Sequence, residues 1–320
     1  MKRSIPVSVF LILFSLLTAD AQDTQQRGRR GRQQRQGQQH RQELYGDTLY
    51  ATADDGTPLK WKVFPAAGPG PHPAVLVIHG GGFVATPASP KTVQTARDAA
   101  AAGFNAFLVD YRLAAARNAL PEQKSAGRYP DQTNDLKQAV RAARKYSGGN
   151  GKVGAIGGSA GGAHDVYLAA TGTKGDDRLD AAVALSGAYD FTDPGSLGHG
   201  NFRRLVMNYA GSSEDELRKA SPITYVDASV SPLYVIASDD EAMPPQQFPD
   251  LIRKLKEVGA TNFRQLWRTN SQQHAFSYWP EVRDQALDFL KENLAEGGNA
   301  AKAHETAAPQ ASVATSPASR

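Results

Sequence analysis

Short apolar runs alternate with stretches of helical periodicity through the central part of the chain. Six runs indicate strands buried on both faces, at residues 74–78, 106–109, 153–156, 181–185, 233–237 and 263–267. Between them, residues 131–146 and 244–258 place their apolar side chains on one stripe, as amphipathic helices do. This alternation predicts a mostly parallel sheet with helices on both faces.

The beginning of this region has a different pattern. Residues 49–53 and 59–64 alternate between apolar and polar positions, and Asp54-Asp55-Gly56 stands between them. A turn between two alternating segments predicts an antiparallel hairpin ahead of the parallel strands.

The N-terminus has the three parts of an export signal. Lys2 and Arg3 precede an apolar run at residues 5–17, and Ala19-Asp20-Ala21 is typical of a cleavage site. We expect cleavage after Ala21 and a secreted or periplasmic protein. The run of 13 residues is shorter than the roughly 18 to 20 that cross a bilayer, so we expect no transmembrane anchor after cleavage.

Two segments lack the apolar side chains that a folded unit needs. Residues 22–43 are rich in Gln, Arg and Gly, and residues 295–320 are rich in Ala, Ser, Thr and Pro. Both compositions predict disordered chain. The expected organisation is therefore a signal peptide (1–21), a linker (22–43), one folded domain (44–294) and a tail (295–320).

Cysteine content and charge exclude several kinds of site and partner. The chain has no cysteine, so it has no disulfide, no thiolate nucleophile and no Cys-based metal site. Residues 1–42 carry eight Lys and Arg against two Asp, so the net charge of +4 becomes −2 for the remainder. The folded part is mildly acidic, and nucleic acid is not an expected partner.

The candidate nucleophile is a serine between glycines. Gly157-Gly158-Ser159-Ala160-Gly161 follows the predicted strand 153–156 and precedes an Ala-rich helical segment. A G-x-S-x-G sequence in this strand–turn–helix setting is typical of a nucleophile elbow, where glycines leave room for a sharp turn. We predict that Ser159 attacks the substrate.

A glycine-rich loop follows the predicted strand 74–78. His79-Gly80-Gly81-Gly82 lies at the carboxyl edge of the sheet, where bare backbone N–H groups can approach a reacting carbonyl. We predict an oxyanion hole made by the N–H groups of Gly81, Gly82 and, from the elbow, Ala160. The loop lacks the G-x-x-x-x-G-K-[S/T] pattern of a phosphate-binding loop.

The candidate base is His274. It follows the last predicted strand, so it lies at the same sheet edge as Ser159 and can accept the serine proton. The chain order of nucleophile, acid and histidine is the one found with a G-x-S-x-G elbow.

The acid that orients this histidine is expected after the strand 233–237, where three consecutive carboxylates follow Ser238. Counting back from the next helix favours Asp240, and counting forward from Pro232 favours Glu241. We predict Asp240, with Glu241 as the first alternative and Asp239 as the second.

These motifs resemble those of the hormone-sensitive-lipase-like carboxylesterases and of bacterial acetyl esterases and feruloyl esterases. The resemblance covers residues 59–294 and is carried by His79-Gly80-Gly81-Gly82, Asp110-Tyr111-Arg112-Leu113, Gly157-Gly158-Ser159-Ala160-Gly161-Gly162, Ser221-Pro222-Ile223-Thr224 and His274-Ala275-Phe276. It implies the α/β-hydrolase fold, the oxyanion-hole donors named above and a bracing role for residues 110–112. It also implies hydrolysis of short-chain acyl esters without a metal or organic cofactor.

Three departures from that family stand out. Ala237-Ser238 occupies the position of its His-Gly before the acid, and residues 114–128 form a longer link than usual, which we expect in the pocket wall. No N-terminal helical cap is evident, so we expect a small or absent cap supplied by this link and residues 189–220. About half of the large apolar side chains there should belong to the core and half to the pocket: Phe191, Phe202, Leu205, Val206, Met207 and Tyr209.

The sequence therefore predicts an exported serine carboxylesterase that works through an acyl-enzyme on Ser159. Its expected partner is a small-molecule or carbohydrate-linked ester, such as an acetylated or feruloylated polysaccharide. A serine amidase or peptidase would carry the same residues, and a non-catalytic ligand-binding protein is a third alternative that the presence of His274 disfavours. The sequence does not fix the oligomeric state.

Overall fold

The structure is a computed structural model that describes residues 46, 48–85, 89–114, 122–197 and 200–295. The predicted signal peptide, the linker and all of the predicted tail except Ala295 lie outside the described residues. Those three predictions therefore stay untested.

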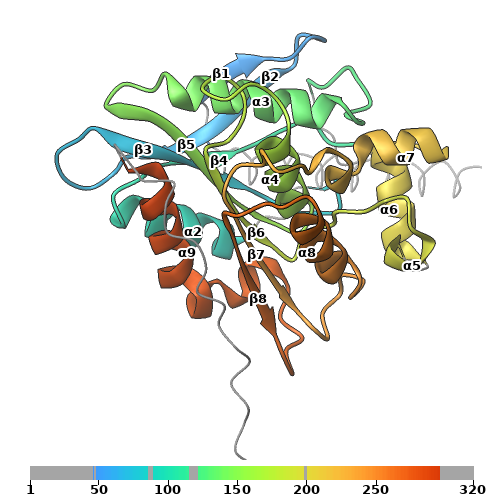
Figure 1. Ribbon diagram of the computed structural model, residues 1–320. Coiled ribbons are helices and arrows are strands. Elements are labelled where there is room, and N and C mark those ends of the chain that lie inside the picture. Colours follow the sequence, from blue (N-terminus) through green and yellow to red (C-terminus); the bar gives the residue numbers. More distant parts are fainter. Residues whose placement is uncertain (1–45, 47, 86–88, 115–121, 198–199, 296–320) are drawn as a thin grey trace, which may run out of the picture.

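The described chain forms an eight-stranded sheet in the order β1-β2-β4-β3-β5-β6-β7-β8 (Figure 1). The pairs β1–β2 and β2–β4 are antiparallel, and all later pairs are parallel. The predicted hairpin and the mostly parallel sheet are thus confirmed. The strands are β1 (Thr48–Thr52), β2 (Pro58–Phe64), β3 (His72–Ile78), β4 (Asn105–Val109), β5 (Gly149–Gly158), β6 (Ala181–Leu185), β7 (Leu233–Ser238) and β8 (Phe263–Arg268).

Helices cover both faces of this sheet, as predicted. On one face, α2 and α9 pack on apolar side chains such as Val77 and Ile156. On the other, α3, α4 and α8 pack on side chains such as Leu76 and Val235. These helices are α2 (Pro90–Ala101), α3 (Asp131–Arg144), α4 (Ala160–Ala170), α8 (Gln247–Glu257) and α9 (Trp279–Leu294).

A smaller helical layer stands between β6 and β7 in the sequence. It consists of α5 (Pro194–Leu197), α6 (Asn201–Ala210) and α7 (Glu214–Ala220), which Figure 1 shows gathered together and apart from α2 and α9. Its apolar side chains join those of Phe83 and Ala160 in a third cluster. The segment expected to supply a small cap is therefore helical, which the sequence reasoning did not predict.

The strand β8 is the last one of the sheet and carries polar side chains, among them Arg264, Gln265 and Arg268. Two short 3-10 turns, Pro222–Tyr225 and Ala275–Tyr278, complete the order of elements. Within the described ranges, none of the helices combines the length and the apolar character needed to cross a bilayer.

Candidate active site

Ser159 lies on a sharp turn between β5 and α4. Its backbone adopts φ 58° and ψ −119°, a conformation that costs a non-glycine residue of order 1–3 kcal/mol. The turn is tightly packed, since a β-carbon at Gly161 would lie 2.1 Å from the carbonyl oxygen of Ile78. The Ser159 N–H donates to the carbonyl oxygen of Leu185 at 2.8 Å. The predicted strand–turn–helix setting of the serine is confirmed.

The loop after β3 passes directly against this serine. A β-carbon at Gly80 would lie 2.9 Å from Cβ of Ser159. Gly81 and Gly82 follow with φ of 108° and 59°, which glycine adopts without steric cost. Ala160 is the first residue of α4, where backbone N–H groups have no partner inside the helix. The three predicted N–H donors thus come from two segments that meet at Ser159, and their use as an oxyanion hole stays a prediction.

His79 and residues 110–112 brace this loop. The buried His79 ring stacks on Tyr111 with 4.3 Å between centroids, and the Tyr111 hydroxyl donates to the His79 carbonyl oxygen at 2.9 Å. The fully buried Arg112 side chain donates to both carboxylate oxygens of Asp135 on α3. The bracing role implied by the family resemblance is thus seen for Tyr111, and Arg112 ties the same segment to α3.

Glu241, rather than Asp240, contacts His274. Oε2 of Glu241 pairs with Nδ1 of His274, and Oε1 accepts the N–H of Ser238 at 2.8 Å. The Glu241 side chain is 2% exposed, whereas that of His274 is 31% exposed. The prediction of Asp240 is wrong, because its exposed carboxylate accepts a hydrogen bond from the Gln272 side chain at 2.8 Å.

The turn after β7 explains this correction. Asp239 and Asp240 form the turn itself, and the Asp239 carboxylate accepts the N–H groups of Ser271 at 3.1 Å and Asn270 at 2.9 Å. These donors hold the pKa of Asp239 below its ordinary value. At the third position the side chain of Glu241 reaches back to the strand end. Counting residues could not show the direction of this turn.

The loop that carries His274 packs against the elbow. A β-carbon at Gly158 would lie 2.7 Å from the ring of Phe276 and 3.0 Å from Cβ of Ala275. The Ala275 N–H also donates to Oγ of Ser186, just beyond β6, at 3.0 Å. The histidine loop is thus fixed beside the residue that precedes the serine, and both predicted partners occupy the carboxyl edge of the sheet.

Arg268, the last residue of β8, connects the acid turn with the histidine loop. It donates to Oγ of Ser238 at 3.0 Å and to Oγ of Ser271 at 2.9 Å. Its guanidinium lies 4.5 Å above the ring of Tyr278 and pairs with Glu281 on α9. Sequence reasoning missed Arg268, because a single arginine at a strand end gives no signal of its role.

A second residue that the sequence reasoning missed lies under the elbow. Asp165 on α4 is fully buried, and neither carboxylate oxygen has a hydrogen-bond partner among the described residues. A β-carbon at Gly157 would lie 2.5 Å from one of these oxygens. Burial raises the pKa of Asp165 well above its ordinary value. The available signal was an acidic residue in a helix whose other side chains, apart from His164 and Tyr167, are apolar.

The helix α6 lies over the glycine loop. A β-carbon at Gly82 would lie 2.7 Å from Cδ1 of Leu205, and Tyr209 stacks on Phe83 with 4.3 Å between centroids. Of the six side chains expected in this segment, three are buried in the core (Phe191, Val206 and Tyr209), and three are half-buried (Phe202, Leu205 and Met207). Half of these side chains thus belong to the core, as expected, and the expected place of the other half in the substrate pocket stays a prediction.

The link after β4 folds back towards the hairpin. The Ser125 N–H donates to the carboxylate of Asp55 at 2.7 Å, and the Gln123 side chain donates to the Leu113 carbonyl oxygen at 2.8 Å. Residues 115–121 lie outside the described ranges, so the expected contribution of this link to the pocket wall stays untested. Within the described residues, no group of three or more His, Asp or Glu side chains could hold a metal ion.

The motifs and their arrangement have counterparts in known proteins. The family model described as BD-FAE matches residues 63–255. The probable carboxylic ester hydrolase LipM of Mycobacterium tuberculosis is 28% identical over 149 residues, which cover 41% of this chain and 35% of LipM. The chain is thus matched to about a third of that relative's length.

Solved structures share the fold. The thermophilic esterase Est2 of Thermogutta terrifontis superposes with a TM-score of 0.62 at 19% identity, over 80% of this chain and 95% of Est2. The same esterase has also been solved phosphorylated by paraoxon. A truncated carbohydrate esterase from gut microbiota gives a TM-score of 0.64 at 16% identity, over 79% of this chain and 98% of the other. The predicted α/β-hydrolase fold is confirmed.

Proposed function

The chain belongs to the BD-FAE family, and from this premise we propose that it is a serine hydrolase that cleaves carboxylic esters through an acyl-enzyme on Ser159. The observation that carries the proposal is the pairing of Glu241 with Nδ1 of His274, in a loop that packs against the residue before Ser159. This pairing leaves Nε2 as the ring nitrogen that can exchange a proton with the serine.

In the proposed reaction, Oγ of Ser159 attacks the ester carbonyl carbon and gives its proton to Nε2 of His274. The negative charge that develops on the carbonyl oxygen is met by the N–H groups of Gly81, Gly82 and Ala160. The carbon–oxygen bond to the alcohol then breaks, and the alcohol leaves with the proton from His274. Water then attacks the acyl carbon and gives a proton to His274. The bond between this carbon and Oγ of Ser159 breaks, the acid is released, and Ser159 takes the proton from His274.

Glu241 fills the role that the sequence analysis gave to Asp240. Its carboxylate holds the imidazole in one tautomer and stabilises the imidazolium formed during proton transfer. The second oxygen of Glu241 is fixed by the Ser238 N–H, so the acid is itself held in place. Such preorganisation is worth several kcal/mol of barrier lowering in comparable sites.

The substrate class we propose is a short-chain acyl ester, with acetyl or feruloyl groups on carbohydrate as the favoured examples. The support for carbohydrate is the structural likeness to a carbohydrate esterase. Export fits the same substrates, because polysaccharides are met outside the cell. For export, the support is the pattern of residues 1–21, and mass spectrometry of the protein from its source should find Gln22 at the N-terminus.

The test of the proposed function combines labelling with turnover. Paraoxon should add one diethylphosphoryl group to the peptide that contains Ser159, as seen by mass spectrometry, and Ser159→Ala should remain unlabelled. On a p-nitrophenyl series from acetate to laurate, we expect a short-chain optimum and a loss of at least about 10⁴-fold in Ser159→Ala. Labelling at another residue, or equal turnover by the variant, would refute the proposal. Turnover of anilides in place of esters would favour an amidase.

A further inference from the structure

A hollow on the outer side of α6 is surrounded by arginines. It has a volume of about 420 Å³, and its lining includes Arg128, Arg203, Arg204, Asn208 and Ser212. We call it the arginine hollow, after the first three of these residues. Arg203 and Arg204 come from α6, and Arg128 precedes α3, so two separate segments bring positive charge to one place.

The arginine hollow holds no carboxylate among the described residues that line it. Arg128 donates to the carbonyl oxygen of Asn208 at 3.1 Å, and Arg204 donates to Oδ1 of Asn201 at 2.6 Å. Both acceptors are neutral. Because each guanidinium has five N–H donors, most of the donors here are left for solvent or for a ligand.

Elsewhere in the described part of the chain, most arginines contact a carboxylate. Eight of them do so: Arg112, Arg141, Arg144, Arg218, Arg253, Arg264, Arg268 and Arg283. Hydrogen bonds from Ser213 and Ser212 lower the pKa of Glu216 on α7, and Arg128 adds only a small attraction to this carboxylate. The Glu216 carboxylate accepts the N–H groups of Ser212 and Ser213 in a capping box, so it serves the helix rather than the arginines.

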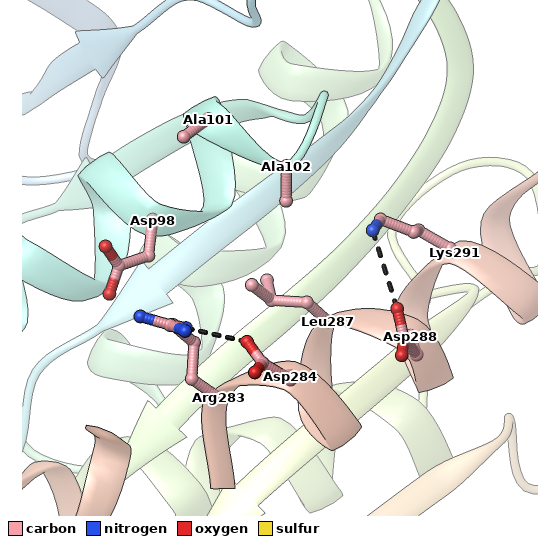
Figure 2. A pocket seen from close by; sticks show the side chains of 8 residues that line it. All are labelled: Asp98, Ala101, Ala102, Arg283, Asp284, Leu287, Asp288 and Lys291. Carbon is pink, nitrogen blue, oxygen red and sulfur yellow. Dashed lines mark hydrogen bonds and ion pairs between the residues drawn. The ribbon is translucent and has the colours of Figure 1, made fainter. Parts of the chain in front are cut away.

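A second hollow, between α2 and α9, shows the usual arrangement (Figure 2). There Arg283 lies 2.8 Å from Asp284 and Lys291 lies 3.5 Å from Asp288. Each cation in Figure 2 thus faces an anion from its own helix. Three neighbouring cations without such anions repel one another, and an anionic ligand would relieve that repulsion.

The arginine hollow is one helix away from the proposed reaction centre. Leu205, the neighbour of Arg204 in α6, makes the close approach to Gly82 in the glycine loop. A ligand group in the hollow would therefore lie on the opposite flank of the helix that covers this loop. A polymeric substrate is long enough to reach both places.

We propose that the arginine hollow is a subsite for a carboxylate on the carbohydrate part of the substrate, such as that of a uronic acid unit. The proposal rests on the esterase function proposed above. Guanidinium groups bind carboxylates through two parallel hydrogen bonds, and an acidic sugar chain brings carboxylates to a site with no carboxylate among its described lining residues. The subsite would select acidic over neutral esterified chains.

The first test measures binding without turnover. Ser159→Ala protein is titrated calorimetrically with trigalacturonate, with neutral xylotriose and with inorganic phosphate. We expect saturable binding of trigalacturonate only, and at least about tenfold weaker binding when Arg128, Arg203 and Arg204 are all changed to Gln. Equal binding of phosphate would make the hollow a general anion site and overturn the proposal of a substrate carboxylate.

A matched control removes the same charge elsewhere. Arg253→Gln, Arg264→Gln and Arg283→Gln together delete three cations that are paired with carboxylates outside the hollow. This variant should bind trigalacturonate as the parent does. If both triple variants lose affinity to the same extent, the binding reflects overall charge, and the proposal fails.

The second test measures selectivity in the active protein. Acetylated oligosaccharides of glucuronoxylan are compared with acetylated neutral xylo-oligosaccharides. The ratio of kcat/KM for acidic over neutral substrate should fall about tenfold in the hollow variant and stay constant in the control. An unchanged ratio in an active enzyme overturns the subsite. Binding to Ser159→Ala protein combined with no ester turnover by the parent would instead place the failure in the proposed function.

Discussion

Arginines lie on two sides of the candidate active site, and the contacts that they make differ between the two sides. On the histidine side, Arg268 lies between the acid turn and the histidine loop and binds Ser238, Ser271 and Glu281. On the α6 side, Arg203 and Arg204 line a hollow that contains no carboxylate among its described residues. Arg268 thus uses its donors to hold the site together, whereas the arginines of the hollow have neutral acceptors among the described residues and keep donors that a ligand could use.

The largest effect is expected on the histidine side, where the two neighbouring carboxylates can be separated. Glu241→Gln keeps the shape of the side chain but removes the charge beside His274, so kcat should fall about 10²–10⁴-fold. Asp240→Asn, one residue earlier, should change kcat by less than about twofold, because the exposed Asp240 carboxylate accepts a hydrogen bond from Gln272 and leaves His274 to Glu241. Steady-state kinetics on p-nitrophenyl acetate separates them, and a larger loss in Asp240→Asn would restore the assignment made from the sequence.

A smaller effect on kcat should follow when Arg268 no longer connects the acid turn with the histidine loop. Arg268→Met removes the donors to Ser238 and Ser271, and we expect about a tenfold lower kcat with a changed pH profile of kcat/KM, since Glu241 and His274 are held less firmly. Arg264→Met is the matched control, because Arg264 lies on the same strand and also contacts a carboxylate and an aromatic ring. Arg268→Lys should recover part of the loss. Similar pH profiles for Arg264→Met and Arg268→Met would reduce Arg268 to a general stabilising residue.

A buried carboxylate without a partner lies under the elbow, since no described residue forms a hydrogen bond with the side chain of Asp165. Its raised pKa means that the folded state binds a proton that the unfolded state loses above about pH 4, so this residue costs stability as the pH rises. Asp165→Asn removes that cost, and the melting temperature should rise by about 3 °C at pH 8. The gain should vanish near pH 4, where both states carry the proton. Calorimetry at the two pH values checks this, and a pH-independent difference would contradict it.

Removal of metal ions is expected to have no effect on turnover. The proposed mechanism assigns every charge at the reacting centre to a side chain or a backbone N–H group, so prolonged treatment with EDTA should leave the turnover of p-nitrophenyl acetate within error. A large loss that Ca²⁺ or Zn²⁺ restores would show that a metal belongs to the site and would refute the expected metal-free chemistry.

The sequence predicted best where a pattern depends on backbone geometry. All six predicted runs fall on observed strands, but only five of these strands are buried: β8 is an edge strand with exposed side chains, so its predicted burial on both faces is wrong. The turn at Ser159 needs glycine at Gly157 and Gly161, which made the elbow recognisable. The predicted strand began too late in β5, because the first residues of β5, from Gly149 on, are polar or glycine and show no apolar run.

The prediction failed where side-chain direction decides the outcome. Three acidic residues follow Ser238, and only the path of the turn makes Glu241 the partner of His274. The helices α5 to α7 are short, so the sequence shows little helical periodicity there. They were expected only as a cap segment of unspecified structure. Arg268 and the arginine hollow depend on residues far apart in the chain, which no local pattern records.

The position of β8 at the end of the sheet has a consequence for association between molecules. An edge strand offers its backbone N–H and C=O groups to any chain that approaches, and charged side chains are a common defence against such pairing. Arg264 and Arg268 are the two charged residues among the six of β8, and Arg268 also holds the histidine loop. Neutralising both should therefore leave an enzyme that is not only slower but also prone to form β-linked aggregates.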